Sequence, residues 1–410
     1  MRIMLINHYA GSEYYGMEFR PYYMAREWVK AGHDVVIIAA DYSHLRTNNP
    51  NIQNDFTEEN IDGITYLWIK TPKYIGNGLS RAKNMGTFAI KLWNKSSFLA
   101  KKYKPEAVIA SSTYPFDMYP ASKIAKKAVA NLFFEIHDLW PLTQIELYGL
   151  SKYNPFVWLL QRGENFAYKK SDRIISILSN ADAHIMERGF DTNKFVYIPN
   201  GAVIKTTNNN VVNPYKQVFD ELRKQGKFIV LYLGGFAEAN ALEELAKSAE
   251  FVEDNVAIVF VGDGAKKQQL MEYSSVKGHK NILFLDRVAK TDVQSVLKSA
   301  DCLYIGAKKC SLYRYGAGMN KIFDYMLAAK PIIYGIEAVN DIVADASCGI
   351  TIPAQNEKAI AQAIKSLMFL TPEERGQMGQ NGFDYVLKNH NYDVLAKKYT
   401  DALDLSKPIQ

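Results

Sequence analysis

Short apolar segments alternate with longer amphipathic segments along the whole chain, and they form two series. The first series is Ile3–Ile6, Val35–Ala39, Val108–Ala110, Leu132–Ile136 and Ile174–Ile177, and the second is Ile229–Leu233, Ile258–Val261 and Cys302–Ile305. Parallel strands that are buried on both faces read as continuous apolar runs, and helices connect them. The pattern therefore predicts an α/β fold with mostly parallel sheets.

The series of strands begins again after an Asn- and Thr-rich segment, Val203–Lys216, which has the composition of a linker. The chain has 410 residues, which exceeds the length that a single hydrophobic core usually stabilises. We therefore expect two Rossmann-like domains, residues 1–205 and 206–388. The last helical segment, in residues 389–410, follows the final strand of the second domain and is expected to pack back on the first.

The composition favours a cytoplasmic protein without a metal centre. No uninterrupted apolar run reaches about 18 residues, and the first residues are too polar for a signal peptide. Cys302, Cys310 and Cys348 are odd in number and lack the spacing of metal ligands, which favours reduced thiols. The net charge of +6 is modest, so attraction to phosphate or anionic lipid would have to come from local clusters.

A glycine-rich turn leads into a predicted helix that begins near residue 320. Gly316 and Gly318 allow a tight turn, and Asn320 is a candidate N-cap. Lys321 lies in the first turn, where the helix dipole disfavours a cation unless an anion is bound. An ion pair between Lys321 and Asp324, on the same helix face, is the alternative interpretation.

Other loops that follow predicted strands of the second half carry residues suited to a nucleotide. Ligands of doubly wound sheets bind at the carboxyl ends of the strands. A single glycine turn there is a weak signal, but several in one domain are hard to explain by packing alone. The candidate residues are Gly234, Gly235, Gly262, Asp263, Gly264, Arg287 and Val288.

The loop after the first strand of the chain contains Gly11 and Gly16 and leads into a helix with Glu18 and Arg20 near its start. The glycine spacing does not fit the dinucleotide fingerprint G-x-G-x-x-G. A glycine-rich loop beside a helix N-terminus also suits a diphosphate, and an ordinary connecting loop is the alternative.

His137, Asp138 and Trp140 follow the predicted strand Leu132–Ile136 directly. A histidine at the carboxyl end of a strand, with an acid beside it, is a candidate to hydrogen-bond a substrate hydroxyl. We expect Asp138 to brace the loop. Trp140 is expected to be a core residue or a wall on which a ligand stacks.

The segment Lys73–Lys104 combines basic residues, among them Arg81, with aromatic residues, among them Trp93. Such a helix suits an interfacial contact with anionic lipid. An amphipathic helix whose apolar side packs on the first sheet explains it equally well. Nothing else in the chain indicates recognition of nucleic-acid bases, so a nucleic acid is disfavoured as the binding partner.

Five motifs, in this order, make the chain resemble a known family over almost its whole length. They are GMEFRPYYMAREWVKAGHDV, EIHDLWP, FVYIPNGA at Phe195–Ala202, VGDG at Val261–Gly264 and KIFDYMLAAKP at Lys321–Pro331. The chain resembles the retaining, metal-independent family 4 glycosyltransferases, and within them the fucosamine or amino-sugar transferase branch of bacterial surface polysaccharide synthesis. The resemblance implies the GT-B fold, in which two Rossmann-like domains face each other across a cleft.

The resemblance also implies roles for individual residues. Asp324 would bind the ribose diol, and backbone amides around Met319 and Asn320 would hold the diphosphate. Arg287 and Val288 would frame the base, and His137 would lie by the donor sugar. Relatives act on polyprenyl-diphosphate-linked sugars, which implies a peripheral contact with the inner face of the cell membrane. Glu18, Arg81, Trp93 and Trp140 are the candidates on this acceptor or membrane side.

The sequence departs from the family pattern at two places. Gly316 stands where many relatives carry the first acid of a Glu-x7-Glu motif, so the motif does not identify the donor sugar. The loop GGFAEAN lacks the basic pair that many relatives place after the first strand of the second domain. The diphosphate charge would then have to be met by Lys321, with Arg314 or Arg20, and by backbone dipoles.

We therefore expect a retaining glycosyltransferase that moves a sugar, with an N-acetylated amino sugar as one candidate, from a nucleoside diphosphate to a lipid-linked glycan. UDP is the favoured nucleotide, and Lys321 and His137 are the catalytic candidates. A non-catalytic nucleotide-sugar-binding subunit and a nucleotide-sugar epimerase on the same fold are the alternatives. A nicotinamide dehydrogenase is disfavoured because the glycine fingerprint is absent.

Overall fold

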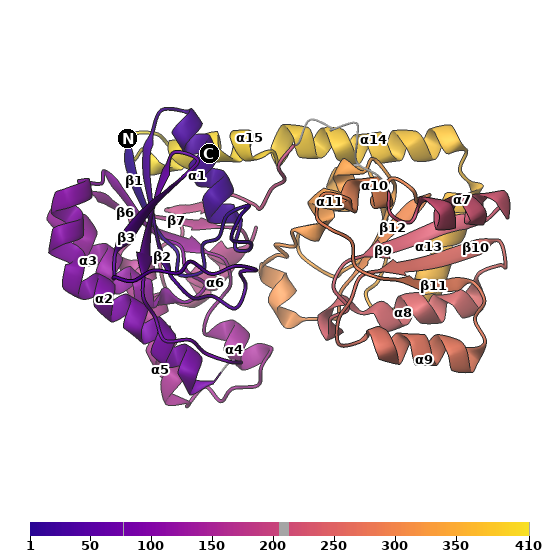
Figure 1. Cartoon of the computed structure of the whole chain (residues 1–410), viewed down its shortest axis with the longest axis horizontal. Coiled ribbons are helices and arrows are strands. Elements are labelled where there is room, and N and C mark those ends of the chain that lie inside the picture. Colours follow the sequence, from indigo (N-terminus) through magenta and orange to yellow (C-terminus); the bar gives the residue numbers. More distant parts are fainter. Residues whose placement is uncertain (77, 205–212, 410) are drawn as a thin grey trace. The chain divides into compact units, whose positions relative to one another are not determined.

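The chain folds into two compact units, seen in a computed structural model that describes residues 1–76, 78–204 and 213–409 (Figure 1). The first unit comprises Met1–Asn200, Arg314–Gly318 and Tyr392–Gln410, and the second comprises Gly201–Tyr313 and Met319–Asn391. The predicted boundary between residues 205 and 206, and most of the predicted linker, lie outside the described residues. Each unit is a sheet covered by helices, and the predicted α/β class with mostly parallel sheets is confirmed.

The sheet of the first unit has the strand order β3-β4-β2-β1-β5-β6-β7-β8. All neighbours pair in parallel except β3 and β4, which form a hairpin. The strands are β1 (Arg2–Ile6), β2 (Asp34–Ala40), β3 (Thr57–Ile61), β4 (Ile64–Ile69), β5 (Ala107–Ala110), β6 (Asn131–Ile136), β7 (Arg173–Ser176) and β8 (Phe195–Tyr197). The hairpin was not predicted, because the polar sequence of β3 (TEENI) gives no apolar run.

Helices cover both faces of this sheet and bury its apolar side chains (Figure 1). They are α1 (Arg20–Lys30), α2 (Leu79–Tyr103), α3 (Met118–Ala128), α4 (Leu142–Glu146), α5 (Pro155–Lys170), α6 (Ala181–Glu187) and α15 (Tyr392–Leu403). The C-terminal helix α15 packs on α1: the indole of Trp28 donates to the carbonyl oxygen of Ala396 (3.2 Å) and its ring lies 5.1 Å from that of Tyr399. The end of the chain is thereby part of the first unit.

The sheet of the second unit has the order β11-β10-β9-β12-β13-β14, and its described strands are all parallel. The strands are β9 (Phe228–Leu233), β10 (Val256–Val261), β11 (Ile282–Leu285), β12 (Cys302–Gly306), β13 (Ile332–Gly335) and β14 (Gly349–Thr351). One hydrophobic core lies on each face of the sheet. β9 is central, so the loop that follows it lies in the middle of the sheet's carboxyl edge.

The helices of the second unit are α7 (Lys216–Lys224), α8 (Leu242–Lys247), α9 (Lys267–Lys277), α10 (Val293–Leu297), α11 (Lys321–Leu327), α12 (Ile342–Asp345), α13 (Glu357–Phe369) and α14 (Pro372–Asn389). α11 contributes Ile322, Phe323 and Met326 to the same core as Leu231 of β9. This packing brings the start of α11 to the carboxyl edge of the sheet. None of the helices in the described parts of the chain is both long and apolar enough to cross a bilayer.

Candidate functional site

Two glycine loops of the second unit pack against each other at the carboxyl ends of β9 and β10. The amide of Gly234 donates to the carbonyl oxygen of Val261 (3.0 Å), and the amide of Phe236 donates to that of Asp263 (2.8 Å). A Cβ atom on Gly262 would lie 1.9 Å from the carbonyl oxygen of Gly234, and its φ of +144° also disfavours other residues. Glycine is therefore required where the two loops meet.

The ammonium of Lys321 lies on the first of these loops. Its Nζ atom is 2.7 Å from the hydroxyl oxygen of Tyr232 and 4.5 Å from the centre of that ring, and it would be 2.7 Å from a Cβ atom on Gly234. The Tyr232 hydroxyl in turn donates to the carbonyl oxygen of Gly235 (2.6 Å). α11 thus places a positively charged side chain at the carboxyl end of β9.

Lys321 has no carboxylate partner among the described residues, and burial lowers its pKa to about 8. An ammonium held away from water without a counter-ion is unfavourable, so an anion bound beside it would be strongly stabilised. Asp324 instead pairs with Lys290, whose Nζ atom is 2.6 Å from its carboxylate. The alternative ion pair between Lys321 and Asp324 is therefore not formed.

The start of α11 is fixed to β9 by a tyrosine rather than by a cap. The Tyr325 hydroxyl accepts a hydrogen bond from the amide of Leu233 (2.8 Å). Asn320 occupies the predicted N-cap position, but its side chain makes no capping hydrogen bond. Met319 precedes it and packs against the core of the second unit.

The loop after β11 carries the predicted base contacts beside Asp324. Arg287 is exposed, whereas Val288 is half-buried and packs on the core. Gln294 of α10 donates to the backbone carbonyl oxygen of Asp324 (2.8 Å), and Lys290 reaches the Asp324 carboxylate from the same loop. The structure therefore brings the predicted base and ribose contacts to one edge of the second unit.

Arg314 and Gly318 are placed with the first unit instead. Arg314 forms a bidentate pair with Glu146, the last residue of α4 (2.7 and 3.0 Å). The carbonyl oxygen of Gly318 accepts a hydrogen bond from the side chain of Asn200 (3.0 Å). The glycine-rich segment and α11, predicted as one clamp, thus belong to different units, and the carboxylate of Glu146 argues against Arg314 as the phosphate contact.

Arg20 is buried in the first unit and serves its structure. Its Nη2 atom lies 2.9 Å from Oε1 of Glu135, and both side chains are only 2% exposed. The same guanidinium donates to the carbonyl oxygens of Ile198 (2.9 Å) and Pro199 (2.6 Å) after β8. These contacts argue against the predicted role of Arg20 at the diphosphate: the guanidinium instead ties β6 to the end of β8.

His137 is held by the same buried group. Its Nε2 atom lies 2.9 Å from the Ser111 hydroxyl oxygen and 3.2 Å from Oε2 of Glu135, and the Ser111 hydroxyl donates to Glu135 (2.6 Å). Burial opposes ionisation of Glu135, but Arg20 and His137 lower its pKa well below the usual range. Because the Ser111 hydroxyl donates its proton to Glu135, a neutral His137 ring in this network carries its proton on Nε2 and presents Nδ1 as an acceptor.

Asp138 braces the loop after β6, as predicted. It accepts hydrogen bonds from the amide of Leu139, the hydroxyl of Thr143 and the indole of Trp140 (2.8, 2.5 and 3.1 Å). The Trp140 ring is thereby fixed beside Arg81, whose guanidinium carbon lies 5.8 Å from the ring centre.

Arg81 also lies near the rings of Tyr9 (5.6 Å) and Tyr74 (6.0 Å), and it donates to the Tyr9 hydroxyl (3.2 Å). This group, which we call the Arg81 cluster, unites the ends of β1 and β6 with the start of α2. Trp93 is not part of it, since it lies three turns further along α2 beneath Lys123.

The other predicted residues of the first unit lie in the loop between β1 and α1. Gly16 has a φ of +94°, and a Cβ atom on it would be 2.8 Å from the amide nitrogen of Thr47. Glu18 is half-buried and its amide donates to the carbonyl oxygen of Tyr9 (3.2 Å). Gly16 is thus required by close packing of two loops.

Four residues that matter for the site were not predicted: Tyr232, Lys290, Ser111 and Glu135. Glu135 had a recognisable signal, because a carboxylate inside the apolar strand NLFFEI must have a buried partner. The other three gave none, since their roles depend on neighbours from distant segments. Within the described residues no group of three or more His, Cys, Asp or Glu side chains is arranged to hold a metal ion.

Comparison with known proteins relates both units to one class of enzyme. Residues 14–205 match the family model described as Glycosyltransferase Family 4, and residues 227–369 match the model described as Glycosyl transferases group 1. One relative is WcaI of Escherichia coli (strain K12), whose name describes a glycosyl transferase of colanic acid biosynthesis. It is 23% identical to this chain over 299 residues, which cover 69% of this chain and 71% of WcaI.

A second relative and a solved structure agree. WbjE of Pseudomonas aeruginosa, whose name describes a glycosyltransferase, is 20% identical to this chain over 351 residues. These residues cover 82% of this chain and 80% of WbjE. The crystal structure of Anabaena HepE in complex with UDP superposes with a TM-score of 0.67 at 13% identity, covering 98% of this chain and 99% of HepE. At that identity the likeness concerns the fold.

Proposed function

We propose that this chain, a family 4 glycosyltransferase of the GT-B fold, transfers a sugar from a UDP-sugar to a lipid-linked glycan with retention of configuration. We place it in surface polysaccharide synthesis, and the name of WcaI, which refers to colanic acid biosynthesis, supports this setting. The crystal structure of HepE with UDP supports a uridine nucleotide as the donor. An N-acetylated amino sugar is our candidate for the transferred group, and no metal ion is expected to take part.

The observation that carries the proposal is the ammonium of Lys321 on the loop after β9. When the donor's bond between sugar and diphosphate breaks, negative charge grows on the diphosphate. A preorganised cation in a site with little water stabilises that charge more than water does. Lys321 supplies from α11 the positive charge that many relatives supply from the loop after β9.

The resemblance to the family suggests roles for the remaining residues. Asp324 would bind the ribose hydroxyls, Arg287 and Val288 would frame the base, and amides near Met319 and Asn320 would face the diphosphate. His137 would use Nδ1 to accept a hydrogen bond from a hydroxyl of the donor sugar, because its Nε2 is committed to Ser111 and Glu135.

Acceptor recognition would fall to the first unit. The Arg81 cluster offers a guanidinium surrounded by aromatic rings, which suits a phosphate group followed by an apolar chain. We further propose that the protein works in the cytoplasm as a peripheral protein at the inner face of the cell membrane.

Thermal-shift measurements and a transfer assay test the proposal. UDP at 100 times its dissociation constant should add about 2.7 kcal/mol of apparent stability. Incubation with a panel of UDP-sugars and polyprenyl-diphosphate-linked glycans should give a product with the donor's anomeric configuration. If no UDP-sugar stabilises the protein, the assigned donor is wrong.

A second candidate function is a non-catalytic subunit that binds a nucleotide sugar. Gly316 has a φ of +114°, so the position of the family's first acid has a backbone conformation that disfavours any other residue. In this case UDP would stabilise the protein, but no acceptor would receive a sugar.

A further inference from the structure

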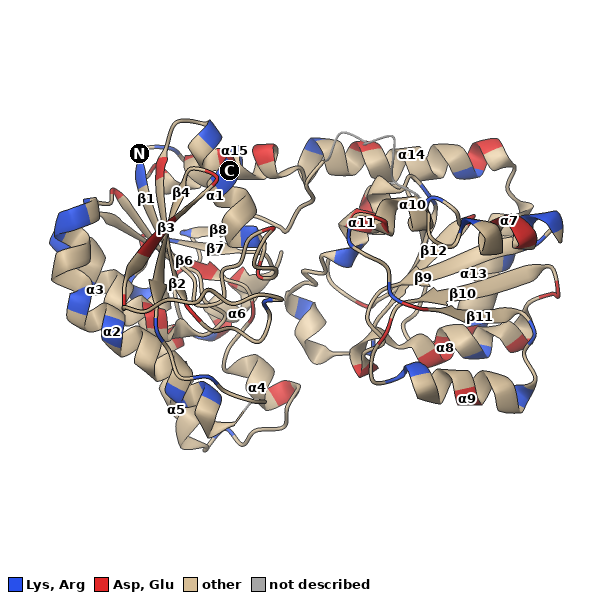
Figure 2. Ribbon diagram, in the orientation of Figure 1, with Lys and Arg blue, Asp and Glu red and all other residues tan. Residues whose placement is uncertain are grey.

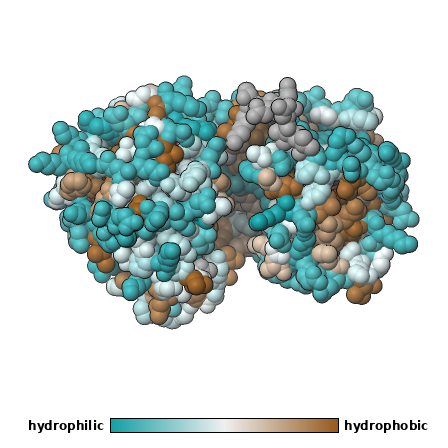
Figure 3. Space-filling view, viewed as in Figure 1, coloured by the Kyte–Doolittle hydropathy of each residue, from teal (hydrophilic) through white to brown (hydrophobic). Residues whose placement is uncertain are grey.

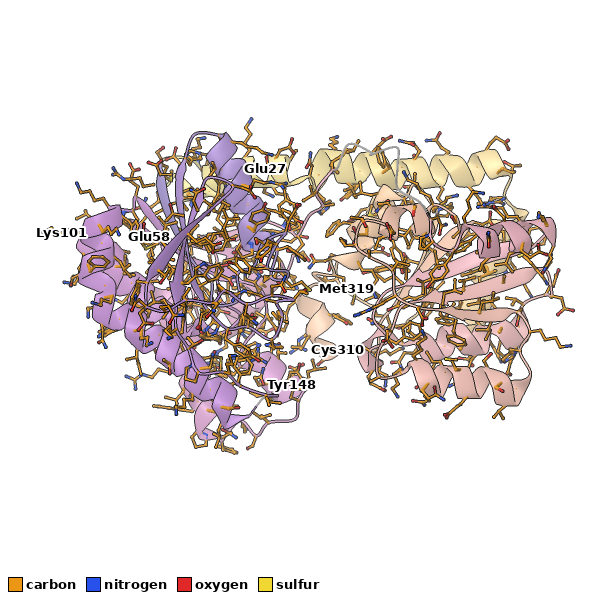
Figure 4. All side chains as sticks on the ribbon, viewed as in Figure 1. Glu27, Glu58, Lys101, Tyr148, Cys310 and Met319 are labelled. Atoms are coloured by element: carbon orange, nitrogen blue, oxygen red, sulfur yellow. The ribbon has the colours of Figure 1, made fainter. Side chains whose placement is uncertain are left out.

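One end of the first unit exposes a group of large apolar side chains that the transfer reaction does not use. Leu147 and Tyr148 follow α4, Tyr153 precedes α5, and Trp158 and Leu159 lie in its first turns, with exposures of 48% to 82%. Figure 3 shows hydrophobic residues on this end, and Figure 4 places Tyr148 there, well away from Lys101 at the far end of α2. We call these residues the α4–α5 surface.

The α4–α5 surface is additional to the apolar face that α5 needs for folding. Val157 and Leu160 of α5 are buried, and Leu160 belongs to the cluster formed with Tyr9, Met85 and Tyr114. Trp158 and Leu159 point away from this cluster into solvent. Because contiguous exposed apolar groups are unfavourable in water, a surface of this kind indicates a binding site.

The start of α2 extends the same surface. Ala82 of α2 and Phe156 of α5 pack on one apolar cluster together with Trp140, so the beginnings of the two helices are neighbours. Ile75 and Leu79, just before and at the start of α2, are 95% and 90% exposed. The apolar groups therefore adjoin the Arg81 cluster through Trp140.

The charges around these apolar groups are mostly positive. Between Leu147 and Gly163 the charged residues are Lys152 and Arg162, and no Asp or Glu occurs between Gly63 and Lys104. Lys152 lies 5.2 Å from the Tyr153 ring centre and Arg162 lies 5.7 Å from that of Trp158. Glu146, at the edge, is paired with Arg314. Figure 2 shows the Lys and Arg residues on α2 and α5.

We infer that the α4–α5 surface docks on an anionic lipid bilayer. Aromatic and aliphatic side chains enter the headgroup region, and cations beside them meet lipid phosphates. The inference rests on the proposed function in that a lipid-linked acceptor lies in such a bilayer. It also places the membrane contact at the α4–α5 end of the unit rather than at Trp93, because two residues of the predicted apolar face near Trp93, Phe88 and Leu92, are buried.

Cosedimentation of the full chain with lipid vesicles tests the inference. The protein should bind vesicles of equal parts phosphatidylcholine and phosphatidylglycerol and bind pure phosphatidylcholine weakly. The variant Trp158→Ser/Leu159→Ser should lower the partition coefficient on the mixed vesicles about tenfold or more, because two apolar side chains lose their burial. Phe369→Ser, which removes an 89% exposed side chain of the second unit, is the matched control and should not change it.

A second variant tests the charges. Lys152→Gln/Arg162→Gln should weaken binding to the mixed vesicles about fivefold for each cation removed and should remove most of the salt dependence. Equal vesicle binding by wild type and the Trp158→Ser/Leu159→Ser variant would overturn the inference. So would a wild-type dimer, seen by sedimentation equilibrium, that this variant dissociates, since the surface would then bind a second copy.

Failure of the inference and failure of the proposed function give different results. Stabilisation by UDP and transfer to a detergent-dispersed acceptor should be unchanged in the Trp158→Ser/Leu159→Ser variant. Loss of vesicle binding with intact transfer supports the docking surface. Vesicle binding by a wild-type protein that UDP does not stabilise would contradict only the proposed function.

Discussion

The Nζ atom of Lys321 lies 2.7 Å from the hydroxyl oxygen of Tyr232, and the two residues come from α11 and β9 of the same unit. The tyrosine hydroxyl accepts from the ammonium and donates to the Gly235 carbonyl oxygen. The cation is therefore positioned by a neutral partner, which leaves its charge available to an anion.

Replacing Lys321 by Met should lower the transfer rate by about a hundredfold or more, since it removes a preorganised charge opposite the leaving diphosphate. Tyr232→Phe keeps the ring but loses the hydrogen bond, and it should cost about tenfold or less. Steady-state kinetics with saturating acceptor measure both variants. Lys280→Met, at an exposed lysine of the same unit, is the control. Full activity of Lys321→Met would contradict the phosphate assignment.

The affinity for UDP should fall at high pH. Burial lowers the pKa of Lys321 from 10.5 to about 8, so the free protein loses this proton above pH 8, whereas the complex retains it. Binding then requires proton uptake, and the affinity should decrease up to about tenfold per pH unit above that value. Calorimetric titration of UDP between pH 7 and 10 measures the effect. A slope that persists in Lys321→Met would assign it to another group.

Asp324 should contribute to UDP binding through the ribose hydroxyls. Asp324→Ala should weaken UDP about tenfold and should weaken 2′,3′-dideoxy-UDP much less, because the second ligand lacks the hydroxyls. Lys290→Ala removes the present partner of Asp324 and serves as the comparison. Isothermal titration gives the four affinities for the two single variants. Equal losses for both ligands in Asp324→Ala would show that the carboxylate does not contact the ribose.

The buried pair Arg20–Glu135 should be required for folding stability. Arg20→Met leaves the Glu135 carboxylate buried without its counter-ion and should lower the free energy of unfolding by about 3–5 kcal/mol. Arg20→Met/Glu135→Leu removes both charges and should recover much of this loss. Urea unfolding of the three proteins measures the difference. A single variant as stable as wild type would show that the pair contributes little.

Asp117 should make the first unit less stable as the pH rises. Its Oδ2 atom accepts from the amide of Ser112 (3.0 Å), while Oδ1 is buried and has no hydrogen-bond partner among the described residues. Burial raises the pKa of Asp117 from 3.8 to about 7, so the folded chain keeps a proton that the unfolded chain loses between these values. The free energy of unfolding therefore decreases across this range.

Asp117→Asn should remove that dependence and raise the free energy of unfolding at pH 8 by about 1–2 kcal/mol, because no charge is then buried. Thermal unfolding at pH 5 and pH 8 measures it, and Asp172→Asn, at another acidic residue of the first unit that accepts a backbone amide, is the control. A variant that is less stable than wild type at both pH values would show that the carboxylate itself is needed.

The second unit shows which structural features local sequence patterns can predict. The apolar runs of β9, β10 and β12 and the glycine loops after β9 and β10 were predicted because buried strands and tight turns restrict the residues at each position directly. The pairing of Asp324 with Lys290 was not predicted, because Lys290 belongs to an exposed loop whose side chains could reach several partners.

The sequence by itself determined an α/β fold with two mostly parallel sheets, the loops at their carboxyl ends, and Lys321 and His137 as residues of interest. Only the tertiary structure decided which charged groups are already paired. Arg20 meets Glu135 and Arg314 meets Glu146, partners 115 and 168 residues apart, whereas Lys321 meets a tyrosine. Hydrophobic periodicity can be read from residues that are close together in the sequence. An ion pair depends instead on which distant segments the fold brings within a few ångströms of each other.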